Sequence, residues 1–228
     1  MARCGKRRST NSIASGLAIS TTICAIILVM GMTMAAAANA QNLYCCTATM
    51  AAPADAAPVL YNLPNGGGAP LTQAGSASGI VDATITLNLR TDACVPLANF
   101  TATDMWLEKE AVAGTDNFVA CSSGTTADAN TDANGVTTWT APLRAGGWST
   151  SRTVVVVAGT AIFESAPLNL RHNSADLNGD GVANLSDIPL FAGDYLGPYA
   201  FRSDLMFDGA VNLSDIPRLA AGIGAACP

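Results

Sequence analysis

Between residues 41 and 170, apolar and polar residues alternate over short runs, as they do in half-buried β-strands. The clearest run is 81–89, in which every second residue is apolar and the residues between are Asp, Thr or Asn. Segments 105–110 and 136–140 are further predicted strands, and the β-branched run 153–157 predicts a strand covered on both faces. The predicted inward face of the clearest run consists of Val81, Ala83, Ile85, Leu87 and Leu89.

Turn signals separate these runs, at residues 64–68, at Asn134-Gly135 and at Gly146-Gly147. About seven short strands in roughly 125 residues predict an antiparallel, immunoglobulin-like β-sandwich.

The segment 128–139 allows two interpretations. Its alternating oxygen-bearing side chains are compatible with a calcium loop, but no ligand stands at the twelfth position, which favours a hairpin turning at Asn134-Gly135. The Asp-x-x-Gly-x-Thr turn at 132–137 resembles those of bacterial immunoglobulin-like domains of the invasin and intimin type. This resemblance covers residues 57–170 and implies a structural or adhesive module.

The last 55 residues change character and contain a calcium-loop pattern. Side-chain oxygens stand at loop positions 1, 3, 5, 9 and 12, Gly181 at position 6 permits a sharp turn, and the Val182 carbonyl stands at position 7. Calcium is a hard cation that takes six to eight oxygen ligands, and this spacing wraps the chain around one ion. The predicted side-chain ligands are Asp176, Asn178, Asp180, Asn184 and Asp187.

The pattern recurs 28 residues later, and eleven positions are identical between residues 176–192 and 204–220. Met206 stands at position 3 of the second copy, where a thioether is no ligand for a hard cation. We therefore expect this loop to bind calcium more weakly or to keep its shape through packing. Its predicted ligands are Asp204, Asp208, the carbonyl of Ala210, Asn212 and Asp215.

An apolar segment follows each loop and predicts a helix, at residues 185–195 and 213–223, with Pro189 and Pro217 in the first turns. Two such small units are expected to pair, with calcium contributing to their folding. The predicted shared core consists of Ile188, Leu190, Phe191, Ile216, Leu219 and Ile223.

The duplicated loop and helix resembles a type I dockerin, a calcium-dependent module that attaches exported proteins to cohesins. The matching residues are the loop ligands, Asp176 and Asp204 first among them. Dockerins often carry a Ser-Thr type pair at loop positions 10 and 11, where this chain has Leu185-Ser186 and Leu213-Ser214, and Arg218 is the one basic residue nearby. The resemblance thus supports calcium binding more strongly than cohesin binding.

The N-terminal 40 residues have a separate composition, with four basic residues, no acid and an apolar run at 13–34 that ends in Ala38-Asn39-Ala40. This is the three-part pattern of a secretory signal peptide cleaved near Ala40, and an uncleaved membrane anchor is the alternative. Cleavage removes four of the 11 basic residues and none of the 17 acidic ones, which changes the net charge from −6 to −10. So acidic a chain is not expected to bind nucleic acid.

Five cysteines follow the signal, an odd number in a compartment that permits disulfides. Our first prediction pairs Cys94 with Cys121, and Cys227 with Cys45 or Cys46, while free thiols remain an alternative.

Catalytic signals are weak. The one histidine, His172, precedes the first loop in a segment that we expect to be an exposed linker. Glu108 and Glu110 fall on one face of a predicted strand, and we expect that face to be solvated. Residues Trp106, Trp139 and Trp148 suit either a sugar platform or core packing, and packing is the commoner fate.

The sequence therefore predicts an exported, noncatalytic calcium-binding protein of the surface or adhesion type. Residues 1–40 are the signal, 41–170 the sandwich and 171–228 the dockerin-like module. The expected partners besides calcium are a cohesin-like or cell-surface protein or a polysaccharide, with a membrane involved only through the signal segment. The alternative function is a true dockerin-bearing accessory subunit of a polysaccharide-degrading complex.

Overall fold

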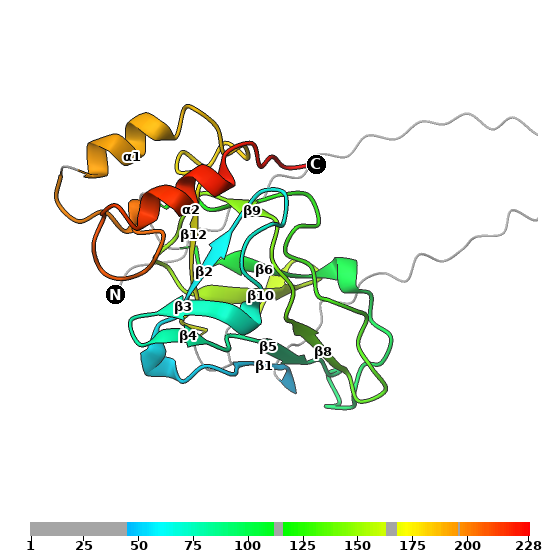
Figure 1. Ribbon diagram of the computed structural model, residues 1–228. Coiled ribbons are helices and arrows are strands. Elements are labelled where there is room, and N and C mark those ends of the chain that lie inside the picture. The colour runs from blue at the N-terminus through cyan, green and yellow to red at the C-terminus, as the bar shows by residue number, and fades with distance from the viewer. Residues whose placement is uncertain (1–44, 112–115, 163–167, 196) are drawn as a thin grey trace, which may run out of the picture. The chain divides into compact units, whose positions relative to one another are not determined.

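The computed structural model describes residues 45–111, 116–162, 168–195 and 197–228, which belong to one compact unit, Ala38–Pro228 (Figure 1). The predicted signal at 1–40 lies outside the described residues. The described part is mainly β, with twelve short strands and two α-helices. No helix in it is long and apolar enough to cross a membrane.

The strands form four small sheets. Their orders are β1-β5-β8, β11-β10-β6, β12-β2-β3-β4 and β7-β9. The strands are β1 (Thr47–Met50), β2 (Val59–Asn62), β3 (Ala74–Ser76), β4 (Gly79–Val81), β5 (Ile85–Asn88), β6 (Met105–Lys109), β7 (Val119–Ala120), β8 (Val136–Trp139), β9 (Ala145–Gly146), β10 (Thr153–Val157), β11 (Thr160–Ala161) and β12 (Arg171–Ser174). The 3-10 turns are η2 (Ala54–Ala56), η3 (Leu71–Gln73), η4 (Ala102–Asp104) and η5 (Phe201–Ser203).

The predicted alternation in the run 81–89 is confirmed, since Ala83, Ile85, Leu87 and Leu89 are completely buried. The run is nevertheless divided between β4 and β5. The reason is local: Asp82 Oδ1 accepts a hydrogen bond from the Thr84 backbone N–H at 2.9 Å, which is an Asx-turn.

The other strand predictions also hold in outline. All of β10 except Val154 is buried, and the strand pairs antiparallel with β6. The hairpin interpretation of 128–139 is confirmed, because Asp132 Oδ1 accepts the Val136 N–H at 2.8 Å and Gly135 has a φ of +75°. Trp139 is a core residue, completely buried, and its Nε1 donates to the Thr125 carbonyl at 3.0 Å.

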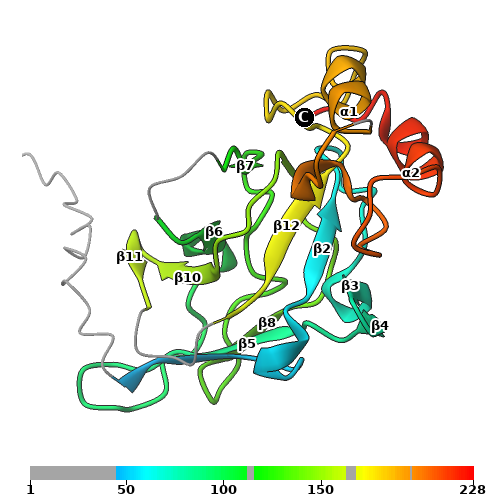
Figure 2. The ribbon, with the colours of Figure 1, turned by 90° about the vertical axis from the view of Figure 1, so that its left-hand side faces the viewer.

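One pair departs from the antiparallel prediction. β12 and β2 run parallel, with His172 opposite Leu60 (Figure 2), while the other named strand pairs of the described residues are antiparallel. The expected exposure of His172 is also wrong: the side chain is completely buried. Asn62 Nδ2 lies 3.1 Å from its Nδ1 and Thr153 Oγ1 lies 2.8 Å from its Nε2, so polar partners satisfy the ring inside the fold.

The two helices are shorter than predicted. α1 is Ile188–Tyr195 and α2 is Asp215–Gly222, so each begins just before its proline and places it in the first turn. Phe191 and Leu219 are buried as expected, but Ile188 and Ile216 are each 41% exposed and do not belong to the core. The apolar cluster of the tail instead includes Tyr61 of β2 and Leu63 just after it, together with Leu177, Phe191, Leu205 and Leu219.

Both predicted disulfide pairings are wrong. Cys45 bonds to Cys94 and Cys121 bonds to Cys227, with Cα–Cα distances of 5.3 and 5.4 Å, while Cys46 is a buried free thiol. Pairing follows distance in the fold, and the second bond spans 106 residues of sequence.

Candidate metal centre

The first predicted loop, residues 176–187, wraps around the carboxylate of Asp176, which is completely buried. Its Oδ1 accepts the Gly179 N–H and its Oδ2 accepts the Gly181 N–H, each at 2.9 Å. Both glycines have positive φ angles, +71° and +86°, which L-residues with a side chain rarely adopt. The glycines thus allow the backbone to close around the carboxylate.

Asp187 closes the other end of the loop and is also completely buried. Its Oδ1 accepts the Asn178 N–H at 3.0 Å and its Oδ2 accepts the Asn184 N–H at 2.8 Å. Its own carbonyl accepts the Phe191 N–H at 3.0 Å, which is a bond of α1. Position 12 therefore joins the loop to the helix that follows it.

The remaining predicted ligands form the exposed or half-buried rim of the loop. Asn178 Nδ2 donates to Asp180 Oδ2 at 2.8 Å, and Asn184 Nδ2 donates to the Val182 carbonyl at 3.1 Å. Asp180 Oδ1 accepts the Val182 N–H at 2.9 Å. All six ligands predicted for this loop therefore belong to one hydrogen-bonded turn.

No basic side chain among the described residues forms an ion pair with the carboxylates of this loop. Arg152 pairs with Glu110 and Arg202 with Asp194, and neither ion pair involves the loop. Burial raises the pKa of Asp176; the Gly181 N–H opposes this shift and the Asp187 charge adds to it. Buried carboxylates without a cation are costly, so the loop suits a positive ion.

The donor set of this loop fits calcium. It offers carboxylate, amide and carbonyl oxygens, which hard cations prefer, around a Gly at the sixth position. Within the described residues, no group of three or more His, Cys, Asp or Glu side chains converges in metal-binding geometry. The predicted set combines carboxylates with two Asn side chains and the Val182 carbonyl.

The second loop, residues 204–215, repeats the same wrapping. Asp204 Oδ2 accepts the Gly209 N–H at 3.0 Å, and the completely buried Asp215 accepts the N–H groups of Leu205, Met206 and Asn212 at 2.7–2.9 Å. Phe207 and Gly209 have φ angles of +61° and +86°, matching the two glycines of the first loop.

Aromatic and cation–π contacts pack this second loop against β3 and Arg218. The Phe207 ring lies so close to Gly75 of β3 that a Cβ at that glycine would be 2.2 Å from Phe207 Cδ2. The Arg218 guanidinium lies 5.4 Å from the centre of the Phe207 ring and 4.7 Å from that of Tyr61, and Arg218 Nη1 donates to the Leu205 carbonyl. Met206 at position 3 is exposed. Packing thus contributes to the shape of the second loop.

Tyr199 adds a donor to the second loop. Its hydroxyl donates to Asp204 Oδ2 at 3.1 Å. Burial and the charge of Asp204 raise the pKa of Tyr199 to about 12, so the hydroxyl keeps its proton at neutral pH. Burial also raises the pKa of Asp204.

The residues that hold the first loop against the strands were not found by sequence reasoning. Asn117 Nδ2 donates to the Leu177 carbonyl at 2.9 Å, and the Gly147 N–H donates to the Asp176 carbonyl at 2.9 Å. A Cβ on Gly146 would lie 1.9 Å from Asp176 Oδ2. The Gly146-Gly147 pair was the available signal, because adjacent glycines permit close backbone approach as well as turns.

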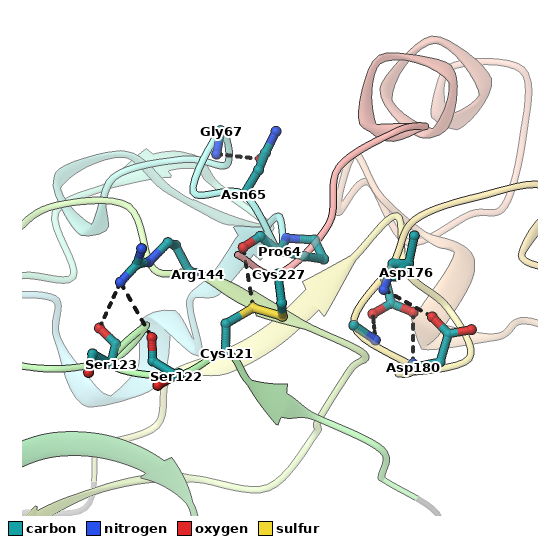
Figure 3. The surroundings of a disulfide bond; sticks show 12 residues. Pro64, Asn65, Gly67, Cys121, Ser122, Ser123, Arg144, Asp176, Asp180 and Cys227 are labelled. Carbon is teal, nitrogen blue, oxygen red and sulfur yellow. Dashed lines mark hydrogen bonds between the residues drawn. A yellow bond between two sulfur atoms is a disulfide. The ribbon is translucent and has the colours of Figure 1, made fainter.

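The C-terminal segment also lies on the first loop, and Figure 3 shows the Cys121–Cys227 disulfide beside Asp176 and Asp180. The Cys227 N–H donates to the Gly181 carbonyl at 2.9 Å. The spacing of the cysteines does not predict this contact between the C-terminal segment and the first loop.

The remaining sequence candidates offer no comparable site. Glu108 is exposed, and Glu110 pairs with Arg152. Trp106 and Trp148 are half-buried, and the Trp148 ring centre is 6.3 Å from that of Phe201.

An exposed apolar groove lies between the two helices. Its volume is about 470 Å³, and Leu185 and Leu213, at position 10 of the two loops, are 73% and 70% exposed. The groove is lined by Leu185, Ile188, Phe191, Ile216, Leu219, Ala220 and Ile223.

Comparison of the chain with protein families, with curated proteins and with solved structures finds no match.

Proposed function

We propose that this chain is an exported, noncatalytic calcium-binding protein of the surface or adhesion type. In this proposal residues 41–170 form an immunoglobulin-like sandwich and the tail, residues 171–228, is a dockerin-like tandem calcium module. The observation that carries the proposal is the first loop. It buries Asp176 and Asp187 completely within an oxygen-lined turn that has no basic side chain in ion-pair contact among the described residues.

Bound calcium would supply the positive charge that these two carboxylates lack. Asp176, Asn178, Asp180, Asn184 and Asp187 would hold it, with the carbonyl of Val182. The apolar cluster of the tail includes Tyr61 and Leu63 from outside it, so ordering the loop also stabilises the contact between the tail and the strands. Calcium is thus proposed as a structural ion.

Export is supported by the basic and apolar pattern of residues 1–40 and by two disulfides, Cys45–Cys94 and Cys121–Cys227. Disulfides persist mainly in oxidising compartments outside the cytosol.

Thermal unfolding tests the structural role. A ligand that binds only the folded state stabilises it by about 2.7 kcal/mol at a hundredfold excess over its Kd. We expect calcium to raise the Tm, a chelator to reverse the rise, and magnesium at equal concentration to have a smaller effect because it prefers a tighter octahedral shell. A Tm that is the same with calcium and with chelator would refute the proposal.

The exposed apolar groove favours a second candidate, a dockerin-like tail that docks on a cohesin of a polysaccharide-degrading complex. Leu185 lines this groove, and Leu213, at the same position of the second loop, is 70% exposed. Arg218, the one basic residue nearby, is held by Leu205, Tyr61 and Phe207. We expect capture by immobilised cohesin to require calcium and to be lost in Leu185→Asp/Leu213→Asp. No calcium-dependent capture would exclude this candidate.

A further inference from the structure

The C-terminal segment pairs with the first loop as a short β-ladder. The Ala183 N–H donates to the Ala225 carbonyl and the Gly224 N–H donates to the Ala183 carbonyl, each at 2.8 Å. The Cys227 N–H donates to the Gly181 carbonyl at 2.9 Å, and Val182 forms a β-bridge with Ala226. The segment therefore lies along positions 6 to 8 of the loop.

This ladder determines which way the Val182 carbonyl faces. Backbone groups of successive residues in an extended segment point in opposite directions. The ladder uses the Gly181 carbonyl and the N–H and carbonyl of Ala183. The carbonyl of Val182 is therefore directed away from the C-terminal segment. On that other side it accepts a hydrogen bond from Asn184 Nδ2 at 3.1 Å. Position 7 of a calcium loop contributes this carbonyl oxygen.

A covalent bond fixes the ladder to the strands. Cys227 bonds to Cys121, which directly follows β7, and β7 pairs with β9. In β9, Gly146 touches the carboxylate of Asp176 (Figure 3 shows the bond and Asp176). The β7–β9 sheet thus contacts position 1 of the loop directly, through Gly146. It is linked to position 7 through the Cys121–Cys227 disulfide and the C-terminal segment.

The second loop differs at the same position. Ala210 forms no β-bridge with any residue of the described ranges, and its N–H donates to Asp208 Oδ1 at 3.0 Å.

Building on the calcium function proposed above, we infer that the Cys121–Cys227 disulfide and residues 225–227 position the Val182 carbonyl for the ion. The disulfide and calcium at the first loop then stabilise each other, because coupling between two binding events is reciprocal. A dithiol reductant that transfers two electrons and two protons converts the bond to two thiols, is itself oxidised to its disulfide, and loosens the loop. Calcium in turn shifts the equilibrium of this reduction toward the intact disulfide.

Calorimetric titration with calcium tests the first half on the wild type, on Cys121→Ser/Cys227→Ser and on the matched control Cys45→Ser/Cys94→Ser. We expect the first double variant to bind about tenfold more weakly, within the range typical of coupled sites, and the control to bind as the wild type does. Equal affinity in all three proteins would overturn the inference and leave the proposed function intact. Absence of calcium binding by the wild type would overturn both.

The equilibrium between each disulfide and its two thiols tests the second half without any substitution, and so applies even where a variant fails to fold. Thiol labelling and mass spectrometry measure the reduced fraction of each bond in mixtures of reduced and oxidised dithiothreitol, with calcium or with chelator. Calcium should shift the equilibrium of Cys121–Cys227 about tenfold toward the disulfide and leave that of Cys45–Cys94 unchanged. An equal shift of both bonds would reveal only general stabilisation, and no shift would contradict the coupling; either result overturns the inference.

Discussion

Gly146 of β9 and Asp176 of the first loop are in direct contact: a Cβ at Gly146 would lie 1.9 Å from Asp176 Oδ2. The backbone of one strand therefore forms a wall of the candidate calcium site. The neighbouring Gly147 N–H donates to the Asp176 carbonyl at 2.9 Å, so the same strand edge also fixes the loop backbone.

This contact predicts that Gly146→Ala displaces the Asp176 carboxylate. We expect the free energy of unfolding to fall by about 1–3 kcal/mol, as in other overpacked sites, and calcium to bind more weakly. Gly193→Ala in α1 is the control, because a Cβ there meets nothing within 4 Å and alanine favours a helix. Denaturant unfolding and calcium titration of both variants check this, and an unchanged calcium affinity in Gly146→Ala would argue against the wall.

Met206 is predicted to be the reason the second loop binds calcium weakly. Met206→Asn adds an amide oxygen at position 3, and the exposed side chain makes the exchange tolerable. We expect the affinity of that loop to rise at least about tenfold, or 1.4 kcal/mol.

The reciprocal variant Asn178→Met should weaken the first loop by a comparable factor. Calorimetric stoichiometry and affinity distinguish the two loops. A second loop that binds equally well with Met and Asn at position 206 would show that position 3 does not limit it.

Phe207 combines an unfavourable backbone conformation with favourable packing. At a φ of +61° a residue with a Cβ is disfavoured by roughly 1–2 kcal/mol relative to glycine. Phe207→Ala loses the ring contact with Gly75 and keeps the backbone cost, whereas Phe207→Gly loses the ring and relieves the cost. We expect the glycine variant to be about 1 kcal/mol more stable than the alanine variant in denaturant unfolding, with both below the wild type. The opposite order would mean that the backbone rearranges.

His172 predicts a loss of stability in mild acid. Burial lowers the pKa of His172 from 6.5 to about 3, so below pH 6.5 the unfolded chain takes up a proton that the folded chain does not. The free energy of unfolding therefore falls as pH falls from about 6.5 toward 3, with a slope that approaches about 1.4 kcal/mol per pH unit.

His172→Gln removes this proton uptake and retains polar atoms for Asn62 and Thr153. Unfolding of both proteins at pH 7, 6 and 5 measures the difference in slope. Identical slopes would indicate that the ring is protonated in the folded state.

The sequence predicts those features of the fold and the site that depend on residues close together in the chain. The candidate calcium loops are recognised from twelve consecutive positions, and the alternation of apolar residues around Ile85 indicates one face of a strand. Patterns over a few residues do not predict contacts between segments that are far apart in the sequence. Asn117 and Leu177 are 60 residues apart and Cys121 and Cys227 are 106 apart, so neither pairing follows from spacing.

His172 was predicted to be exposed and is completely buried, again because of contacts with distant parts of the chain. It precedes the first loop in what looked like an exposed linker, and it is buried among partners from distant parts of the chain, Asn62 and Thr153. Ile188 and Ile216 were expected in the core for their hydrophobicity and are exposed, whereas Tyr61 and Leu63, which lie far away in the sequence, belong to the apolar cluster of the tail.

Calorimetric titration of the protein with calcium is the most direct test of the central claim. Asp180→Ala removes an exposed predicted ligand with little disturbance of packing, and Asp104→Asn removes a charge from an exposed residue of η4 as a control. We predict at least one calcium site in the wild type and in Asp104→Asn, with the tightest site abolished in Asp180→Ala. A wild type that binds no calcium, or an Asp180→Ala variant that binds it as tightly as the wild type, would contradict the account.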